Sequence, residues 1–175
     1  MTDQHLLHMQ LREACRLLSE HMKARWNRHV SFGDLVSDRW TTATAYGFGK
    51  GTSCYDNVLI LGDVKVGENT WIGPNCVLDG SGGLTIGDYC SISAGVQVYT
   101  HHTVEWARTM GKAEVEKAPT SIGSGVYIGP NTIIQKGVTI GDRAVIGACS
   151  LVNKDVPADA KAWGVPARIQ EAADV

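Results

Sequence analysis

The chain has 175 residues, of which 43% are hydrophobic and 19% are charged, and its formal net charge is −2 at pH 7. This length suits one domain with a terminal appendage. The balanced charge, with no basic stripe, argues against nucleic acids and anionic membranes as partners. No apolar run approaches the roughly 18 residues that span a bilayer, so we expect no membrane span.

The N-terminus and the cysteines indicate a reducing compartment. The first residues show no signal-peptide pattern. The five cysteines form an odd count without paired spacing, and the sequence has no CxxC or HxxxH motif of the kind that indicates a zinc site. Reduced thiols are typical of the cytoplasm. We therefore expect a cytoplasmic protein without a bound metal ion.

Residues 1–57 differ from the rest of the chain and form an N-terminal helix with a connecting segment. Apolar residues recur there at spacings of four and three: Leu7, Leu11, Ala14, Leu18, Met22 and Trp26. This spacing predicts an amphipathic helix over residues 3–26. We expect its apolar stripe to pack on the first turn of the following domain. Residues 30–57 mix charges with a loop-like segment, and such charges are more often solvated than functional.

From residue 58 onward, aliphatic residues recur every six positions. This period fits neither an α-helix nor a plain strand, and it is the signature of a parallel β-helix built from hexapeptides. The first run is Ile60, Val66, Ile72, Leu78, Ile86, Ile92 and Val98, with a two-residue slip at 82–83. The second run is Ile122, Ile128, Ile134, Ile140, Ile146 and Val152. Three hexapeptides, about 18 residues, would close one triangular coil.

The neighbours of each aliphatic marker support this interpretation. The residue two positions earlier is small or β-branched and shares the inward face of a strand. The residue after the marker is often Gly, followed by Asp, Asn or Pro, and such residues suit sharp corners. Each hexapeptide is therefore a short strand plus a corner. Chance periodicity in an ordinary sheet is the poorer explanation, because short strands in sandwiches drift in spacing.

The residue between the two inward positions points outward, and several of these residues are apolar. With a repeat of about 18, Tyr127 would stack on Val145, and Ile133 on Leu151. Trp71 adds another apolar side chain to the outside. Large exposed apolar patches on soluble proteins usually mark an interface, so we predict a homo-oligomer. Cover by the chain's own terminal segments remains the alternative.

Between the two runs, residues 100–117 preserve the six-residue spacing, but the inward positions no longer hold aliphatic residues. The inward slots would hold His102, Arg108 and Glu114, and a dry core cannot accept those charges. This stretch must therefore leave the coil as a long loop, and such loops are often functional. His101 and His102 stand where the strand ends. A histidine there suits a general base near neutral pH, although a corner-capping histidine without chemistry is an equal alternative.

The C-terminal repeat run carries a family resemblance. Its sequence, PTSIGSGVYIGPNTIIQKGVTIGDRAVIGACSLVNKDVPADAKAWGVPAR, resembles the hexapeptide-repeat acyltransferases, and within them the sugar O-acetyltransferases of galactoside, maltose and surface-polysaccharide type. The resemblance covers residues 58–169. It implies a mainly β fold, a left-handed parallel β-helix over residues 58–170 that departs from the usual right-handed crossover. Residues 171–175 would form a C-terminal tail.

The resemblance also implies an activity and an assembly. The protein would transfer an acetyl group from acetyl-CoA to a sugar hydroxyl, in bacterial surface-glycan synthesis. The acceptor would be a sugar or a nucleotide sugar, and no metal ion is needed. The assembly would be a homotrimer with its active sites between neighbouring subunits.

The resemblance, together with the chemistry that it implies, indicates five residues for the reaction centre. His101 takes the place of the catalytic base, and His102 ranks second, as a substrate-binding residue. A backbone N–H near Gly129, one coil further on, would stabilise the oxyanion. Asp79, at a corner where most repeats carry Gly, matches an acceptor-binding aspartate, and a plain turn aspartate is the alternative. Glu105 is a candidate to hold the second ring nitrogen of His101 or to bind the acceptor.

Four further residues match the cofactor side. Ala148 begins the segment whose backbone would meet the pantetheine amides of acetyl-CoA. Asn153 and Lys154 form the corner that would meet its later portion, and Arg168 matches an arginine that meets the phosphates, where a planar cation suits.

Other functions remain open beside sugar O-acetylation. The nearest ones keep the fold and the donor but change the acceptor to an amino-sugar nitrogen, a serine or an antibiotic. A carbonic anhydrase of the same helix type would need three metal-binding histidines, whereas the repeat region holds only the adjacent His101 and His102. A non-catalytic oligomerising scaffold is the last alternative, and the charged loop beside the paired histidines argues against it.

Overall fold

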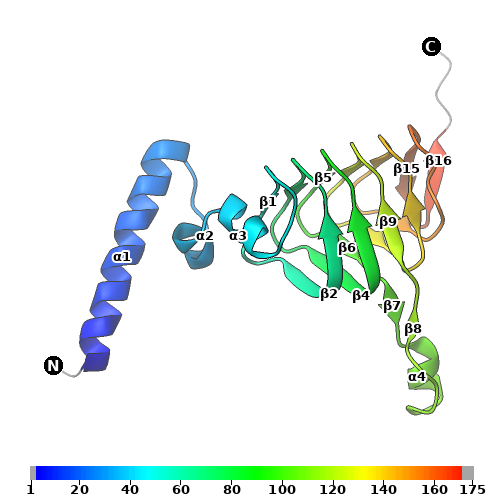
Figure 1. The fold of residues 1–175 in the computed structure, drawn as a ribbon, viewed down its shortest axis with the longest axis horizontal. Helices are drawn as coiled ribbons and strands as arrows, with labels where there is room; N and C mark the ends of the chain where they lie inside the picture. The colour runs from blue at the N-terminus through cyan, green and yellow to red at the C-terminus, as the bar shows by residue number, and fades with distance from the viewer. Residues whose placement is uncertain (1–2, 171–175) are drawn as a thin grey trace.

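The structure, a computed structural model, describes residues 3–170 (Figure 1). The expected tail at 171–175 lies outside the described residues. Three helices, α1 (Asp3–Trp26), α2 (Phe32–Val36) and α3 (Arg39–Ala45), precede a stack of parallel β coils. The strands are β1 (Ser53–Cys54), β2 (Leu59–Val66), β3 (Trp71–Ile72), β4 (Val77–Ile86), β5 (Ser91–Ile92), β6 (Gln97–Val98), β7 (His101–His102), β8 (Glu116–Lys117), β9 (Thr120–Ile122), β10 (Tyr127–Ile128), β11 (Ile133–Ile134), β12 (Thr139–Ile140), β13 (Val145–Ile146), β14 (Leu151–Val152), β15 (Lys161–Gly164) and β16 (Ala167–Gln170).

The coils stack with the predicted register, which confirms the parallel β-helix. Tyr127 pairs with Val145, and Ile133 pairs with Leu151, each one repeat further along the chain. β1 already stacks on β3, so the first strand lies ahead of the expected boundary at residue 58. Within the described residues, no helix combines the length and apolar character that a membrane crossing requires.

The aliphatic markers fill the inside of the coils. Ile72, Ile128, Ile134 and Ile146 are each at most 1% exposed. Small polar residues between them satisfy their own hydrogen bonds, as Thr132 does by donating from Oγ1 to the carbonyl of Gly147 at 2.9 Å. The corners place asparagines in the left-handed region: Asn69, Asn75 and Asn131 have φ of 52°, 59° and 57°. The hexapeptide is thus a strand plus a corner, as predicted.

The interruption at 100–117 is an antiparallel hairpin rather than an irregular loop. β7 pairs with β8, and the short helix α4 (Val104–Arg108) lies near its tip. Figure 1 shows this arm projecting from the side of the stack. The coil resumes in phase behind it, because Ser91 pairs with Tyr127 at twice the usual sequence separation. The arm is therefore an insertion within one turn of the β-helix, and it is as long as one coil.

The N-terminal helix has the predicted bounds but not the predicted packing. α1 has no buried residue, and Leu11 is 48% exposed. Figure 1 shows the helix standing away from the coils and joined to them through α2 and α3. Asn27, at φ 50°, ends the helix and turns the chain toward α2 instead of laying the stripe on the first coil. The expectation that α1 packs on that coil is wrong for this chain.

The apolar outer positions remain uncovered. Trp71 is 65% exposed and Tyr127 is 43% exposed. Between residues 3 and 170, neither terminal segment covers these two side chains. The described part of the chain therefore does not supply the intramolecular cover that was the alternative to an oligomer.

Candidate active site

His101 lies where β6 leaves the coil and the arm begins. Its Nδ1 lies 2.5 Å from Oδ2 of Asp79, a residue of β4 in the preceding coil. The two residues meet because Leu78 pairs with Val98, which aligns the following residues of both coils. The side chain of His101 is 29% exposed, whereas that of Asp79 is completely buried. The histidine therefore presents an edge to solvent while its other edge is held from inside.

The environment of Asp79 keeps its carboxylate ionised. Burial alone would raise the pKa of this carboxyl, but hydrogen bonds from Ser81, Thr100 and His101 hold the pKa well below its usual range. An ionised carboxylate only accepts hydrogen bonds, so Nδ1 of His101 carries the proton. The free electron pair of the ring is then on Nε2, which is the state that a general base requires.

Thr100 joins the two residues, and no pattern in the sequence singles it out. Its backbone N–H donates to Oδ2 of Asp79 at 2.9 Å, and its hydroxyl donates to the Asp79 carbonyl at 2.8 Å. The same hydroxyl accepts from the backbone N–H of Gly82 at 2.7 Å. A Cβ on Gly82 would lie 2.5 Å from the Thr100 carbonyl oxygen, so only glycine fits there. Thr100 is completely buried, and it fixes the approach of Asp79 to His101.

These contacts change the expected roles of two acidic residues. Asp79 was expected to bind an acceptor, but its side chain has no exposed surface and instead contacts His101. Glu105 was a candidate to hold the ring nitrogen, but its Oε1 accepts from Nη1 of Arg108 at 2.7 Å on α4. The carboxylate that orients His101 is therefore that of Asp79.

His102 belongs to a separate polar cluster at the base of the arm. Its Nε2 lies 3.4 Å from Oε2 of Glu116, and the same carboxylate oxygen lies 3.3 Å from Nζ of Lys136. Its Nδ1 is buried without a hydrogen-bond partner among the described residues. The two adjacent histidines thus have different surroundings: His101 contacts a fully buried carboxylate, whereas His102 contacts a half-exposed carboxylate that Lys136 also contacts.

Gly129 and Ala148 come together one coil apart, but the Gly129 amide is occupied. A Cβ on Gly129 would lie 2.4 Å from the backbone nitrogen of Ala148. The N–H of Gly129 donates to the carbonyl of Ile146 at 2.8 Å, and the following residue, Pro130, has no N–H. The expected role of Gly129 as the oxyanion donor is therefore corrected, because the coil ladder already uses its amide.

The three expected cofactor-binding residues at the C-terminal end do share a cavity. It has a volume of about 210 Å³, and Asn153, Lys154 and Arg168 line it together with Asp155 and apolar side chains. The hairpin of β15 and β16 supplies Arg168, which lies opposite Trp163 in the register. His101 and Ala148 are not part of its lining. Between residues 3 and 170, no group of three or more His, Cys, Asp or Glu side chains is placed to hold a metal ion.

Two family models match the coils. Residues 119–154 match the model described as bacterial transferase hexapeptide (six repeats), and residues 63–100 match the hexapeptide repeat of succinyl-transferase. A hexapeptide-repeat-containing acetyltransferase of Vibrio cholerae, solved in complex with acetyl coenzyme A, aligns with a TM-score of 0.70 and 30% identity over 93% of this chain and 89% of that chain. The chain belongs to the hexapeptide-repeat acetyltransferase family.

Two sequence relatives in this family match the coils. Galactoside O-acetyltransferase of Escherichia coli is 37% identical over 108 residues, covering 61% of this chain and 53% of that protein. Nodulation protein L of Rhizobium meliloti is 39% identical over 109 residues, covering 62% of this chain and 59% of that protein. The chain thus spans between half and three fifths of the length of these relatives.

Proposed function

We propose that this protein is an acetyl-CoA-dependent acetyltransferase that acetylates a sugar hydroxyl. The observation that carries the proposal is the contact between His101 Nδ1 and the buried carboxylate of Asp79. That contact fixes the ring, leaves the electron pair on Nε2 and stabilises the imidazolium that forms when the base takes a proton.

The reaction follows from these charges. Nε2 of His101 removes the proton of an acceptor hydroxyl as its oxygen attacks the thioester carbonyl. When the tetrahedral species collapses, the carbon–sulfur bond breaks, and the imidazolium returns its proton to the leaving thiolate. The acetyl group moves directly to the acceptor, so no serine or cysteine nucleophile is required. Gly129 has no oxyanion role in this scheme, because its amide is used in the ladder.

The C-terminal cavity has the chemistry of a donor site. Apolar walls suit a thioester chain, while Lys154 and Arg168 offer cations for phosphate groups. Structural relatives support acetyl-CoA as the donor, since the Vibrio cholerae protein was solved with it. Asn153, beside these cations, and Ala148, along the same edge of the coils, are further proposed contacts to acetyl-CoA.

We further propose that the working unit is a homotrimer. His101 and the donor cavity belong to different coils of one chain and share no lining residue, so a neighbouring subunit would complete each site. The uncovered Trp71 and Tyr127 supply apolar surface for that contact. His102 and Glu105, on the arm beside His101, are the proposed contacts to the acceptor.

A sugar acceptor is supported by the named activity of the relative from Escherichia coli, which is a galactoside O-acetyltransferase. We propose a sugar or a nucleotide sugar as the acceptor, which would suit a cytoplasmic step of bacterial surface-glycan synthesis. The role of Asp79 in this proposal is to position His101 rather than to bind the sugar.

Calorimetric titration of acetyl-CoA into the purified protein tests the donor. The expected result is saturable binding with one site per chain, weakened at least about tenfold by Arg168→Ala because a charge-assisted phosphate contact is lost. Release of free thiol is then followed with a galactoside, with maltose and with glucosamine as acceptors. Thiol release that depends on a hydroxyl acceptor supports the proposal. Release with the amine alone would mean N-acetylation, and absence of acetyl-CoA binding would leave a scaffold.

A further inference from the structure

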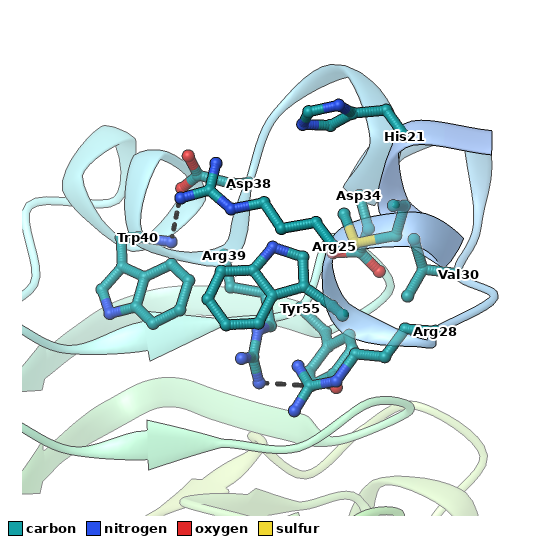
Figure 2. A pocket seen from close by; sticks show the side chains of 11 residues that line it. His21, Arg25, Arg28, Val30, Asp34, Asp38, Arg39, Trp40 and Tyr55 are labelled. Atoms are coloured by element: carbon teal, nitrogen blue, oxygen red, sulfur yellow. Dashed lines mark hydrogen bonds between the residues drawn. The ribbon is translucent and has the colours of Figure 1, made fainter. Parts of the chain in front are cut away.

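A cavity lies far along the chain from His101, beside the N-terminal helices. Its volume is about 410 Å³, within the range of small-molecule sites. The last turn of α1, the segment that follows it, and the helices α2 and α3 enclose it together with Tyr55. Figure 2 shows the long side chains of Arg25, Arg28 and Arg39 reaching into the space between these elements. We call this space the N-terminal cavity.

Aromatic rings hold two of the three guanidinium groups. Cζ of Arg39 lies 5.0 Å from the ring centroid of Trp40 and 4.9 Å from that of Tyr55. Cζ of Arg25 lies 5.1 Å from the ring centroid of Trp26. A guanidinium that lies over a ring uses its face and keeps the N–H groups at its edge for other partners. The cations are therefore held in place without their hydrogen-bonding capacity being consumed.

Three arginines and two aspartates line the cavity, so positive charge is in excess there. Within residues 3–170, none of these three arginines forms an ion pair, whereas Arg16, Arg108 and Arg143 do. The single side-chain hydrogen bond from the three goes from Nη1 of Arg39 to the hydroxyl of Tyr55 at 3.4 Å, within the same part of the chain. A set of preorganised, unpaired guanidinium groups is a receptor for an anion.

The two carboxylates that line the cavity are committed elsewhere. Oδ1 of Asp38 caps α3 by accepting from the backbone N–H groups of Trp40 and Thr41 at 3.0 and 2.9 Å. Asp34 is buried and accepts from the backbone N–H of Asp56 at 3.2 Å. Burial, and then the nearby charge of Asp56, raise the pKa of Asp34. Neither carboxylate replaces an anionic ligand.

We propose that the N-terminal cavity binds a small molecule that carries both a phosphate group and a ring. The edges of Arg25, Arg28 and Arg39 would hold the phosphate oxygens, and the half-exposed faces of Trp26 and Trp40 would contact the ring. A nucleoside diphosphate and a sugar phosphate share this chemistry. The site is separate from the His101 centre and from the donor cavity, and it does not depend on the proposed acetyltransferase activity.

Calorimetry with three probes tests the proposal: UDP, glucose 1-phosphate and inorganic pyrophosphate. All titrations contain saturating CoA, so that the proposed donor cavity cannot take up the probe. At least one probe should bind with one site per chain. Tighter binding of UDP would identify a nucleoside ligand, and tighter binding of glucose 1-phosphate a phosphorylated sugar. Equal binding of pyrophosphate would overturn the proposed ring contact, because the anionic group alone would then supply the affinity.

Paired substitutions locate the binding. Arg25→Gln and Arg28→Gln each remove one exposed guanidinium and should weaken the best probe by about tenfold or more, because a charge-assisted contact is lost. Arg12→Gln is the matched control, since Arg12 lies on the same helix but outside the cavity, and it should leave the affinity unchanged. The proposal is overturned if no probe binds the unaltered protein, or if Arg12→Gln weakens binding as much as Arg25→Gln. Unchanged thermal unfolding of all three variants would exclude a general loss of fold.

Discussion

The coils and the N-terminal helix both carry a regular apolar pattern, yet only the coils bury it. The marker Ile134 has no exposed surface, whereas Leu11 of α1 is 48% exposed. In the coils, each marker contacts markers above and below it and the other walls of the same turn, so the repeat closes on itself. A single helix has no such closure and needs a second surface. A period therefore determines the local conformation, while burial depends on what else the chain brings to that face.

Polar groups follow the same contrast. The carboxylate of Asp79 enters the coil, and it does so with the backbone N–H groups of Ser81 and Thr100 and the ring of His101 as partners. In the N-terminal region, arginines collect around open space without carboxylate partners. The buried carboxylate in the coil thus has hydrogen-bond partners that hold it in one position, which is what a reaction centre requires.

Among the tests of this contrast, His101→Ala has the largest expected effect. If the reaction centre is in the coil, the variant should lower kcat for acetyl transfer by about 10²–10⁴, because the general base is lost. The affinity for acetyl-CoA should change little, since the donor cavity contains no part of His101. Steady-state kinetics and calorimetry on the same preparation measure both quantities. Near-normal turnover would show that another group is the base.

The next test compares burial directly. Ile134→Ala should lower the free energy of unfolding by about 2–5 kcal/mol, because a fully buried side chain is replaced by a cavity that the stacked coils cannot close. Urea unfolding monitored by circular dichroism gives the value. A loss below about 1 kcal/mol would mean that the coil relaxes around the cavity, contrary to a closely packed repeat.

The coils were predictable from the sequence because their geometry is periodic. The six-residue spacing gave the register of Tyr127 on Val145, and the glycine and asparagine corners gave the turns. The backbone hydrogen bonds between coils follow the same period, and they rule out the Gly129 amide as an oxyanion donor. Glycines that follow a marker donate to the marker of the next coil, as Gly123 does to Ile140 and Gly129 to Ile146. Counting these bonds beforehand would have shown that the Gly129 amide is occupied.

The contact between Asp79 and His101 was harder to predict. Asp79 reads as a corner residue, and the two-residue slip at 82–83 obscures which residue of the next coil it meets. The burial of its side chain also depends on Thr100 and Gly82, whose backbone and hydroxyl positions no periodicity specifies. The exposed stripe of α1 failed for a related reason, since a pattern shows which face is apolar but not what meets it.

The third test removes the charge that orients the base. Asp79→Asn keeps the size of the side chain but removes the ionised acceptor, and it should lower kcat by about 10–100-fold through loss of positioning. It should also change how the free energy of unfolding depends on pH in the acidic range. Because folding lowers the pKa of Asp79, its stabilising contribution is complete above the unfolded value of about 4 and is lost as pH falls below that value toward the lower folded pKa.

Urea unfolding of both proteins between neutral pH and about pH 3 checks the sign. The difference in unfolding free energy between the unaltered protein and Asp79→Asn should be constant near neutrality and shrink below about pH 4. A difference that stays the same across the whole range would mean that Asp79 is not ionised in the folded protein, and the assignment of the proton to Nδ1 of His101 would fail with it.

The smallest expected effect is that of Leu11→Ala, which removes a similar volume to Ile134→Ala from the other apolar pattern. Because Leu11 is exposed in the folded chain and in the unfolded chain, the change should alter the unfolding free energy by no more than about 0.5 kcal/mol. Light scattering of the variant, compared with that of the unaltered protein, should give the same mass. A loss of about 2 kcal/mol together with a lower mass would show that a second copy of the chain covers the stripe of α1. Both apolar patterns would then be buried, the one in the coils within a single chain and the one on α1 between two chains.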